Sequence, residues 1–250
     1  IVLAWSLFLS ACPAPVSLPQ IKPESETGRG VAVPHEPPAR GNPSLKRIAL
    51  EAIKVAVYQA GDRNELGIRV TPELAAAYAA YHRRDIDGAL AALDEVTAKA
   101  ADPLMRWVAA SLRFDALHVL GRPADAEAVA TGLATLEQEL LGHDLTAQAM
   151  RGLARLELAD YDSALADFGR VVRAIDRWSL PTSYSGPPTN LVEVKSLSEA
   201  QMRAYAGIAS IHFLQKNYSA ALRWAEATEG LFNDLFYVLT HPLYGSSFIP

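Results

Sequence analysis

The sequence predicts an all-α protein in which short helical hairpins repeat along the chain. After residue 42, apolar residues recur at intervals of three and four through most of the sequence, which is the period of an amphipathic helix. One stretch of two short helices and a tight turn recurs at several positions, and such self-similarity is typical of stacked repeats. No segment shows a convincing strand pattern.

The clearest hairpin is Gly152–Phe168, GLARLELADYDSALADF, with a tight turn at Asp160. Its first helix carries small and apolar residues, and its second places Ala164, Leu165 and Phe168 three and four residues apart on one face. Because alanine is small, Ala164 lets the two helices approach closely while larger side chains fill the space around it.

The same pattern recurs around three other alanines. The four packing positions are Ala89, Ala126, Ala164 and Ala221, separated by 37, 38 and 57 residues. The last separation predicts an insertion of roughly 23 residues beyond one repeat period of about 34. An ordinary alanine-rich helical bundle is the alternative, since both architectures share the helical period.

The hairpin resembles the tetratricopeptide repeat in Gly152, Tyr161, Ala164 and Phe168. This resemblance implies a tetratricopeptide-like α-solenoid of about four helix–turn–helix repeats. We expect the domain to occupy residues 42–250, with a lead-in helix and one long insertion at 177–195 between the third and fourth repeats.

Residues 1–11 resemble the end of a secretory signal. The run Ile1–Leu9 is almost entirely apolar, and Leu9-Ser10-Ala11-Cys12 resembles the bacterial lipobox, in which the cysteine is lipidated. Cys12 is the one cysteine of the chain. The sequence departs from a full signal because it starts with Ile1 and no cation precedes the apolar run. The alternative is that this apolar run forms a buried strand or helix.

Residues 12–41 are predicted to be a lipidated cysteine followed by a disordered tether. Seven prolines lie between Pro13 and Gly41, with few large apolar residues, and such a segment cannot bury a core. Proline rather than aspartate follows Cys12, which in lipoproteins of this kind favours the outer membrane, facing the periplasm.

Capping and breaking residues place the helices from residue 42 onward. Asn42-Pro43 begins a lead-in helix, Ser44–Ala60, and Thr71-Pro72 and Asp102-Pro103 begin repeat helices. Ser196 and Glu199 have the spacing of a capping box at the start of the fourth repeat. The later helices are expected at Leu104–Leu120, Ala124–Leu140, Leu145–Ala159, Tyr161–Arg177, Leu197–Gln215 and Tyr218–Leu239.

The residues that carry chemistry do not form a catalytic pattern. The six histidines are scattered, the single cysteine leaves no thiolate cluster for zinc, and no phosphate loop or nucleophile elbow is present. The net charge of −5 without a basic cluster argues against a nucleic-acid surface. We therefore expect no catalytic residues, no metal site, no cofactor and no enzyme.

The tetratricopeptide resemblance implies a concave groove lined by one face of each first helix. Carried onto this sequence, the groove that binds the partner consists of Tyr78, Tyr81, His82, Asp115, His118, Leu153, Leu156, Glu157, Ser210 and Phe213. The lining is aromatic and apolar, which suits a protein or peptide partner with apolar anchors. Any one of these residues could instead face a neighbouring helix.

The expected function is that of a lipid-anchored scaffold or adaptor that binds other cell-envelope proteins and helps to assemble an outer-membrane or secretion complex. The insertion, with Trp178 and Tyr184, is long enough to be functional. The alternative is a ligand-binding lipoprotein of a transport system, in which the 177–195 insertion closes over the groove.

Overall fold

Every regular element is an α-helix in the residues that the computed structural model describes, which are 36–37, 72–177 and 191–240. Every described helix belongs to one compact unit, Val31–Pro250. The signal, Cys12, the tether apart from residues 36–37, the lead-in helix, Trp178 and Tyr184 lie outside the described residues. The helices are α3 (Pro72–His82), α4 (Ile86–Lys99), α5 (Pro103–Val119), α6 (Pro123–Leu141), α7 (Leu145–Glu157), α8 (Tyr161–Arg177), α9 (Leu191–Leu214) and α10 (Tyr218–Thr240).

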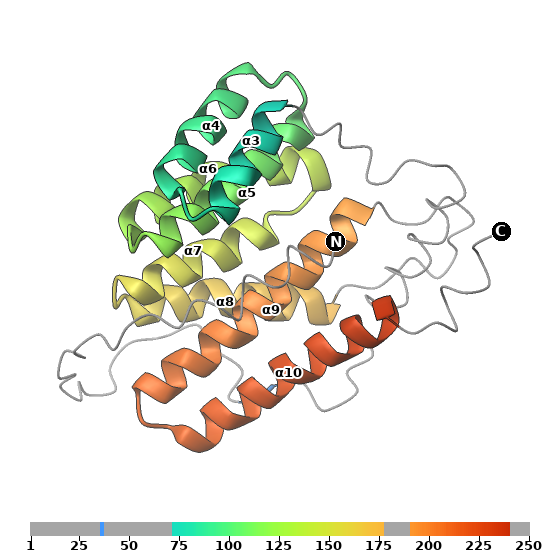
Figure 1. Cartoon of the computed structure of the whole chain (residues 1–250). Coiled ribbons are helices and arrows are strands. Elements are labelled where there is room, and N and C mark those ends of the chain that lie inside the picture. The colour runs from blue at the N-terminus through green and yellow to red at the C-terminus, as the bar shows by residue number, and fades with distance from the viewer. Residues whose placement is uncertain (1–35, 38–71, 178–190, 241–250) are drawn as a thin grey trace, which may run out of the picture. The chain divides into compact units, whose positions relative to one another are not determined.

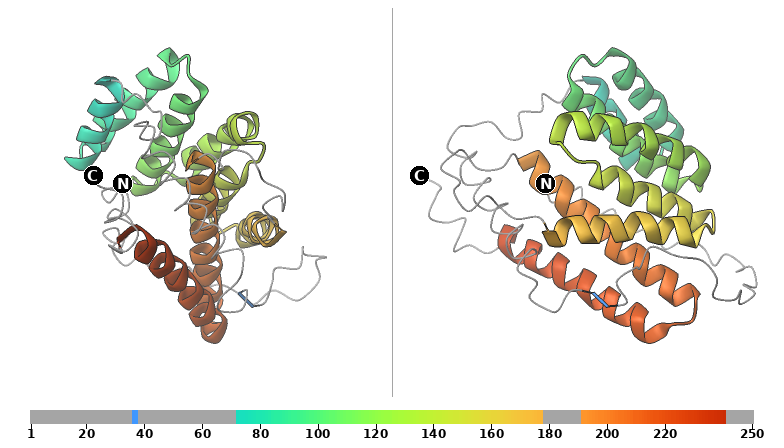
Figure 2. Two further views of the ribbon diagram at one scale, coloured as in Figure 1. Left: turned by 90° about the vertical axis from the view of Figure 1, so that its right-hand side faces the viewer. Right: turned by 180° about the vertical axis from the view of Figure 1, so that it is seen from behind.

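The helices pair into four hairpins, α3–α4, α5–α6, α7–α8 and α9–α10, and each helix also packs on the next along the chain. In addition, α9 contacts α7, the first helix of the preceding hairpin. The turns within the hairpins lie along one edge of the stack in Figure 1 and in the reverse view of Figure 2. The all-α prediction is therefore confirmed, with the hairpins stacked in chain order.

Most predicted boundaries agree with the structure to within one or two residues, but the start of α9 does not. This helix begins at Leu191, six residues before the predicted start, so residues 191–195 of the predicted 177–195 insertion are helical. Ser196 is therefore inside the helix, where it is buried and bonded to α6 and α7, and it is not an N-cap.

The four hairpin turns have the same backbone conformation. Each has one residue in the left-handed region, with φ between 61° and 64°: Arg84, Gly121, Ala159 and Lys216. The N–H of this residue bonds to the carbonyl three residues earlier, and the next N–H bonds to the carbonyl five residues earlier, at 2.8–3.1 Å. This is the Schellman motif that satisfies the last carbonyls of a helix.

The turns fix the register of the packing alanines. Each alanine follows the left-handed residue of its own turn by five positions, so both sets have the separations 37, 38 and 57. Ala89, Ala126 and Ala164 are fully buried, and Ala221 is 7% exposed. The alanine positions and the turn positions therefore define the same repeat register.

Three apolar clusters follow one another through the stack. The first joins α3, α4 and α5, and the second joins α5, α6 and α7. The third joins α7 to α10 around Phe168. A Cβ atom built on Gly152 would lie 2.5 Å from the Phe168 ring, and one built on Gly207 would lie 2.2 Å from it. The ring of Phe168 therefore contacts the backbone of α7 and α9 directly.

The turn conformation predicts opposite effects of two substitutions. Ala159→Gly should raise the free energy of unfolding by about 0.5–1 kcal/mol, because glycine adopts positive φ without the steric cost of a Cβ. Gly121→Ala should lower it by about 1 kcal/mol for the same reason. Urea unfolding monitored by circular dichroism measures both. Effects of the same sign would contradict a left-handed turn residue at these two positions.

Candidate functional site

The candidate site is the surface that the first helices of the four hairpins present near their carboxyl ends. It consists of the residues three and six positions before each left-handed turn residue, and we call it the first-helix surface. Its members are Tyr78 and Tyr81 of α3, Asp115 and His118 of α5, Leu153 and Leu156 of α7, and Ser210 and Phe213 of α9. Equal register places these side chains on corresponding faces of successive helices.

An ion pair joins two distant first helices across this surface. Arg203 of α9 donates to Asp115 of α5 at 3.0 Å, and its guanidinium lies 5.6 Å from the centroid of the Phe114 ring. The Arg203 side chain is only 4% exposed, whereas that of Asp115 is 34% exposed. A buried charge of this kind is costly without its partner. The pair therefore connects α9 to α5 although 88 residues separate Arg203 from Asp115.

Tyr81 of α3 belongs to the same group. Burial raises the pKa of its phenol, the charge of Asp115 raises it further, and Arg203 acts in the opposite direction. The phenol therefore stays protonated at neutral pH and can donate a hydrogen bond.

A second contact joins α5 to α7 one turn further along. Nδ1 of His118 lies 2.7 Å from Oε1 of Glu157, although the two atoms are not aligned as a hydrogen bond. The His118 ring stacks on Phe114, with the centroids 6.1 Å apart. Both side chains keep about a third of their surface exposed, so a bound chain could reach them.

The other predicted lining residues divide into exposed and packed ones. His82, Ser210 and Phe213 are exposed, and the Phe213 ring contacts Tyr218 of α10. Tyr78, Leu153 and Leu156 are partly buried because they pack against the apolar clusters. The structure thus brings Tyr81 close to Asp115, and His118 close to Glu157. Phe213 lies at the far end of the surface.

The sequence prediction missed Arg203, the buried cation that pairs with Asp115 of this surface. One signal was available, because Arg203 is the single cation within the predominantly apolar stretch Met202–Leu214. Its partner could not be identified from the sequence, since Asp115 belongs to a different repeat.

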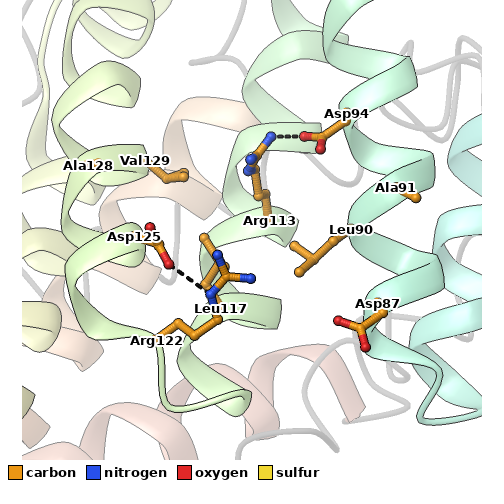
Figure 3. Close-up of a pocket in the computed structure, with 10 residues that line it drawn as sticks. All are labelled: Asp87, Leu90, Ala91, Asp94, Arg113, Leu117, Arg122, Asp125, Ala128 and Val129. Carbon is orange, nitrogen blue, oxygen red and sulfur yellow. Dashed lines mark hydrogen bonds and ion pairs between the residues drawn. The ribbon is translucent and has the colours of Figure 1, made fainter.

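A hollow of about 600 Å³ lies on the side formed by the second helices, over α5 between α4 and α6. Figure 3 shows its two ion pairs, Arg113 with Asp94 and Arg122 with Asp125. Leu90, Leu117 and Val129 supply apolar walls. Both arginines are therefore engaged by carboxylates of the protein itself.

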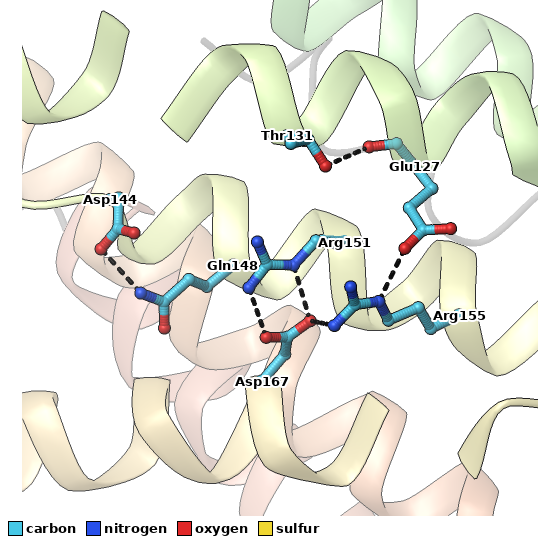
Figure 4. A network of polar contacts seen from close by, with 7 residues as sticks. All are labelled: Glu127, Thr131, Asp144, Gln148, Arg151, Arg155 and Asp167. Atoms are coloured by element: carbon cyan, nitrogen blue, oxygen red, sulfur yellow. Dashed lines mark hydrogen bonds and ion pairs between the residues drawn. The ribbon is translucent and has the colours of Figure 1, made fainter. Parts of the chain in front are cut away.

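Two further polar networks hold the helices together. Asp167 of α8 is 2% exposed and accepts hydrogen bonds from Arg151 and Arg155 of α7 (Figure 4). Arg155 also donates to Glu127 of α6 at 2.7 Å. All four charged groups are thus used between neighbouring helices, which is a structural role.

Glu137 of α6 binds the amino terminus of α7. Its fully buried carboxylate accepts the backbone N–H groups of Thr146 and Ala147 at 3.1 and 2.8 Å, and the hydroxyl of Ser196 at 2.7 Å. Burial raises the pKa of Glu137, and these hydrogen bonds oppose that rise. The nearby His143 has a lowered pKa because it is desolvated. Glu137, Thr146 and Ser196 are fully buried, so this cluster joins α6, α7 and α9 in the interior.

Comparison with protein-family models, with curated proteins and with solved structures found no match. Among the described residues, no group of three or more histidine, cysteine, aspartate or glutamate side chains is arranged to hold a metal ion. No helix in the described ranges is both long and apolar enough to cross a bilayer. What the described residues offer is a partly exposed, mixed aromatic and polar surface on a rigid helical frame.

Proposed function

We propose that this protein is a scaffold of the cell envelope, built as a tetratricopeptide-like α-solenoid and anchored to the membrane by lipidated Cys12. Its first-helix surface binds a protein or peptide partner. At the outer membrane, facing the periplasm, it would assist the assembly of an outer-membrane or secretion complex.

The observation that carries this proposal is the common register of the four hairpins. Identical turns present equivalent positions of α3, α5, α7 and α9 in succession. Such repetition creates an extended surface, which suits an extended ligand better than a compact metabolite.

The spacing of the helices indicates how a peptide would bind. Packed helices lie about 8–10 Å apart, and an extended chain rises about 3.3 Å per residue. An extended peptide that crosses from α7 to α9, which pack on each other, would therefore reach the second helix after about three residues. Tyr81 and Phe213 offer aromatic contacts toward the two ends, and Asp115 and His118 offer polar contacts between them.

Site-specific cross-linking in cells tests this assignment. A photoreactive phenylalanine at exposed Ser210, on the first-helix surface, should yield a discrete protein adduct. The same group at exposed Thr135, on the second helix α6, is the control and should yield none. Phe213→Ala should weaken the adducted partner's affinity about tenfold, as expected for a peripheral hot spot worth about 1.4 kcal/mol.

Equal labelling from Ser210 and Thr135 would contradict a specific first-helix surface. A small molecule that co-purifies with the protein, without any protein adduct, would favour the ligand-carrier alternative.

Lipidation is tested separately. Cys12→Ser should leave the helical content unchanged and release the protein from membranes. Each buried acyl CH₂ contributes about 0.8 kcal/mol to anchoring, and stable attachment requires more than one chain. Membrane sedimentation and far-ultraviolet circular dichroism measure the two properties. A serine variant that still sediments with membranes would show that the anchor lies elsewhere.

A further inference from the structure

The spaces between successive second helices differ in what fills them. The first interspace lies between α4 and α6 over α5, and the second interspace lies between α6 and α8 over α7. In the second interspace, Arg155 of α7 donates to Glu127 of α6 at 2.7 Å and to Asp167 of α8 at 2.9 Å (Figure 4). One long cation and two carboxylates therefore span the second interspace.

The same three positions of the first interspace carry aliphatic side chains. These positions are four before a left-handed turn residue on the first helix, six after one on the preceding second helix, and eight after one on the following second helix. They hold Arg155, Glu127 and Asp167 in the second interspace, and Leu117, Leu90 and Val129 in the first. Because aliphatic side chains form no such bridge and Leu117 is shorter than Arg155, a hollow of about 600 Å³ remains in the first interspace (Figure 3).

The rim of this hollow has one more carboxylate than it has cations. Its charged residues are Asp87, Asp94, Arg113, Arg122 and Asp125. Arg113 pairs with Asp94, and Arg122 pairs with Asp125. Asp87 is exposed, faces the hollow from the α4 side in Figure 3, and is paired with no cation among the described residues. The hollow thus combines aliphatic walls with one uncompensated negative charge.

We propose that this hollow binds a small organic cation with an apolar body. The body rests on Leu90, Leu117 and Val129, and the ammonium or guanidinium group of the ligand donates to Asp87. The volume is in the range of small-molecule sites, and the charge of the rim selects a cation. The hollow lies on the side of the second helices, apart from the first-helix surface, so the inference does not depend on the proposed function.

The chain offers a matched control for Asp87. This residue also lies in the first turn of α4, where a carboxylate interacts favourably with the helix dipole. Asp162 has the same position in α8, three residues after the left-handed turn residue, and it is exposed but does not line the hollow. Asp87→Asn and Asp162→Asn therefore remove the same dipole interaction, and only the first removes a charge from the hollow.

Phenethylamine is the probe, and phenethyl alcohol, which has the same ring without the charge, is its control. Added to the full chain carrying Cys12→Ser, the amine should shift the backbone amide resonances of Leu90, Leu117 and Val129. The alcohol should bind about fivefold more weakly, as expected for the loss of one exposed ion pair. Asp87→Asn should weaken binding of the amine by about the same factor and leave the alcohol unchanged. Asp162→Asn should change neither.

Filling the hollow provides a second test. Ala128→Leu places a larger side chain on its wall and should weaken binding of both probes. Ala124→Leu, at an alanine of the same helix that does not line the hollow, should weaken neither. Both alanines are exposed, so neither substitution should lower the melting temperature.

Three results would overturn the proposal. Absence of resonance shifts at millimolar phenethylamine would show that the hollow is not a binding site. Equal binding of the amine and the alcohol, or equal losses from Asp87→Asn and Asp162→Asn, would show that Asp87 does not recognise the charge. Binding of acetyl-lysine amide without binding of phenethylamine would assign the hollow to a lysine side chain of a partner protein.

Discussion

The contact of Phe168 with two glycine backbones is the constraint on which the second half of the stack depends. The ring lies against Gly152 of α7 on one side and Gly207 of α9 on the other, where no Cβ could be accommodated without movement. One side chain therefore fixes the distance from α8 to both neighbouring first helices. The α7–α9 contact, the burial of Ile208 and the position of Arg203 beside α5 all require α9 to lie this close.

The repeated turn gives each hairpin two surfaces at fixed registers. Positions three and six before the left-handed residue belong to the first-helix surface, whereas the residue six positions after it, Leu90 in α4 and Glu127 in α6, contacts the following hairpin. Ion pairs on both surfaces join different hairpins, such as Asp115 with Arg203 and Glu127 with Arg155. The turn geometry thus places both the stacking contacts and the proposed binding surface.

Local features of the fold were predictable because their physical causes lie within one hairpin. Ala164 and Phe168, four residues apart, indicate both the helical face and the close approach of its neighbour. The start of α9 was not predictable in this way. Ser196 and Glu199 match a capping box by spacing, yet the hydroxyl of Ser196 bonds to Glu137, which is 59 residues away. Arg203 and Asp115 are likewise joined only by tertiary structure, so sequence period alone could not place them in one site.

Two chemically identical substitutions test the close-packed frame most directly. Gly207→Ala should lower the free energy of unfolding by about 1–3 kcal/mol, because the added methyl group overlaps the Phe168 ring. Gly132→Ala, inside α6 with open space around the new Cβ, should raise it by about 0.5–1 kcal/mol through helix propensity alone. Equal gains from both substitutions in urea unfolding would contradict direct packing of Phe168 on the backbone of α9.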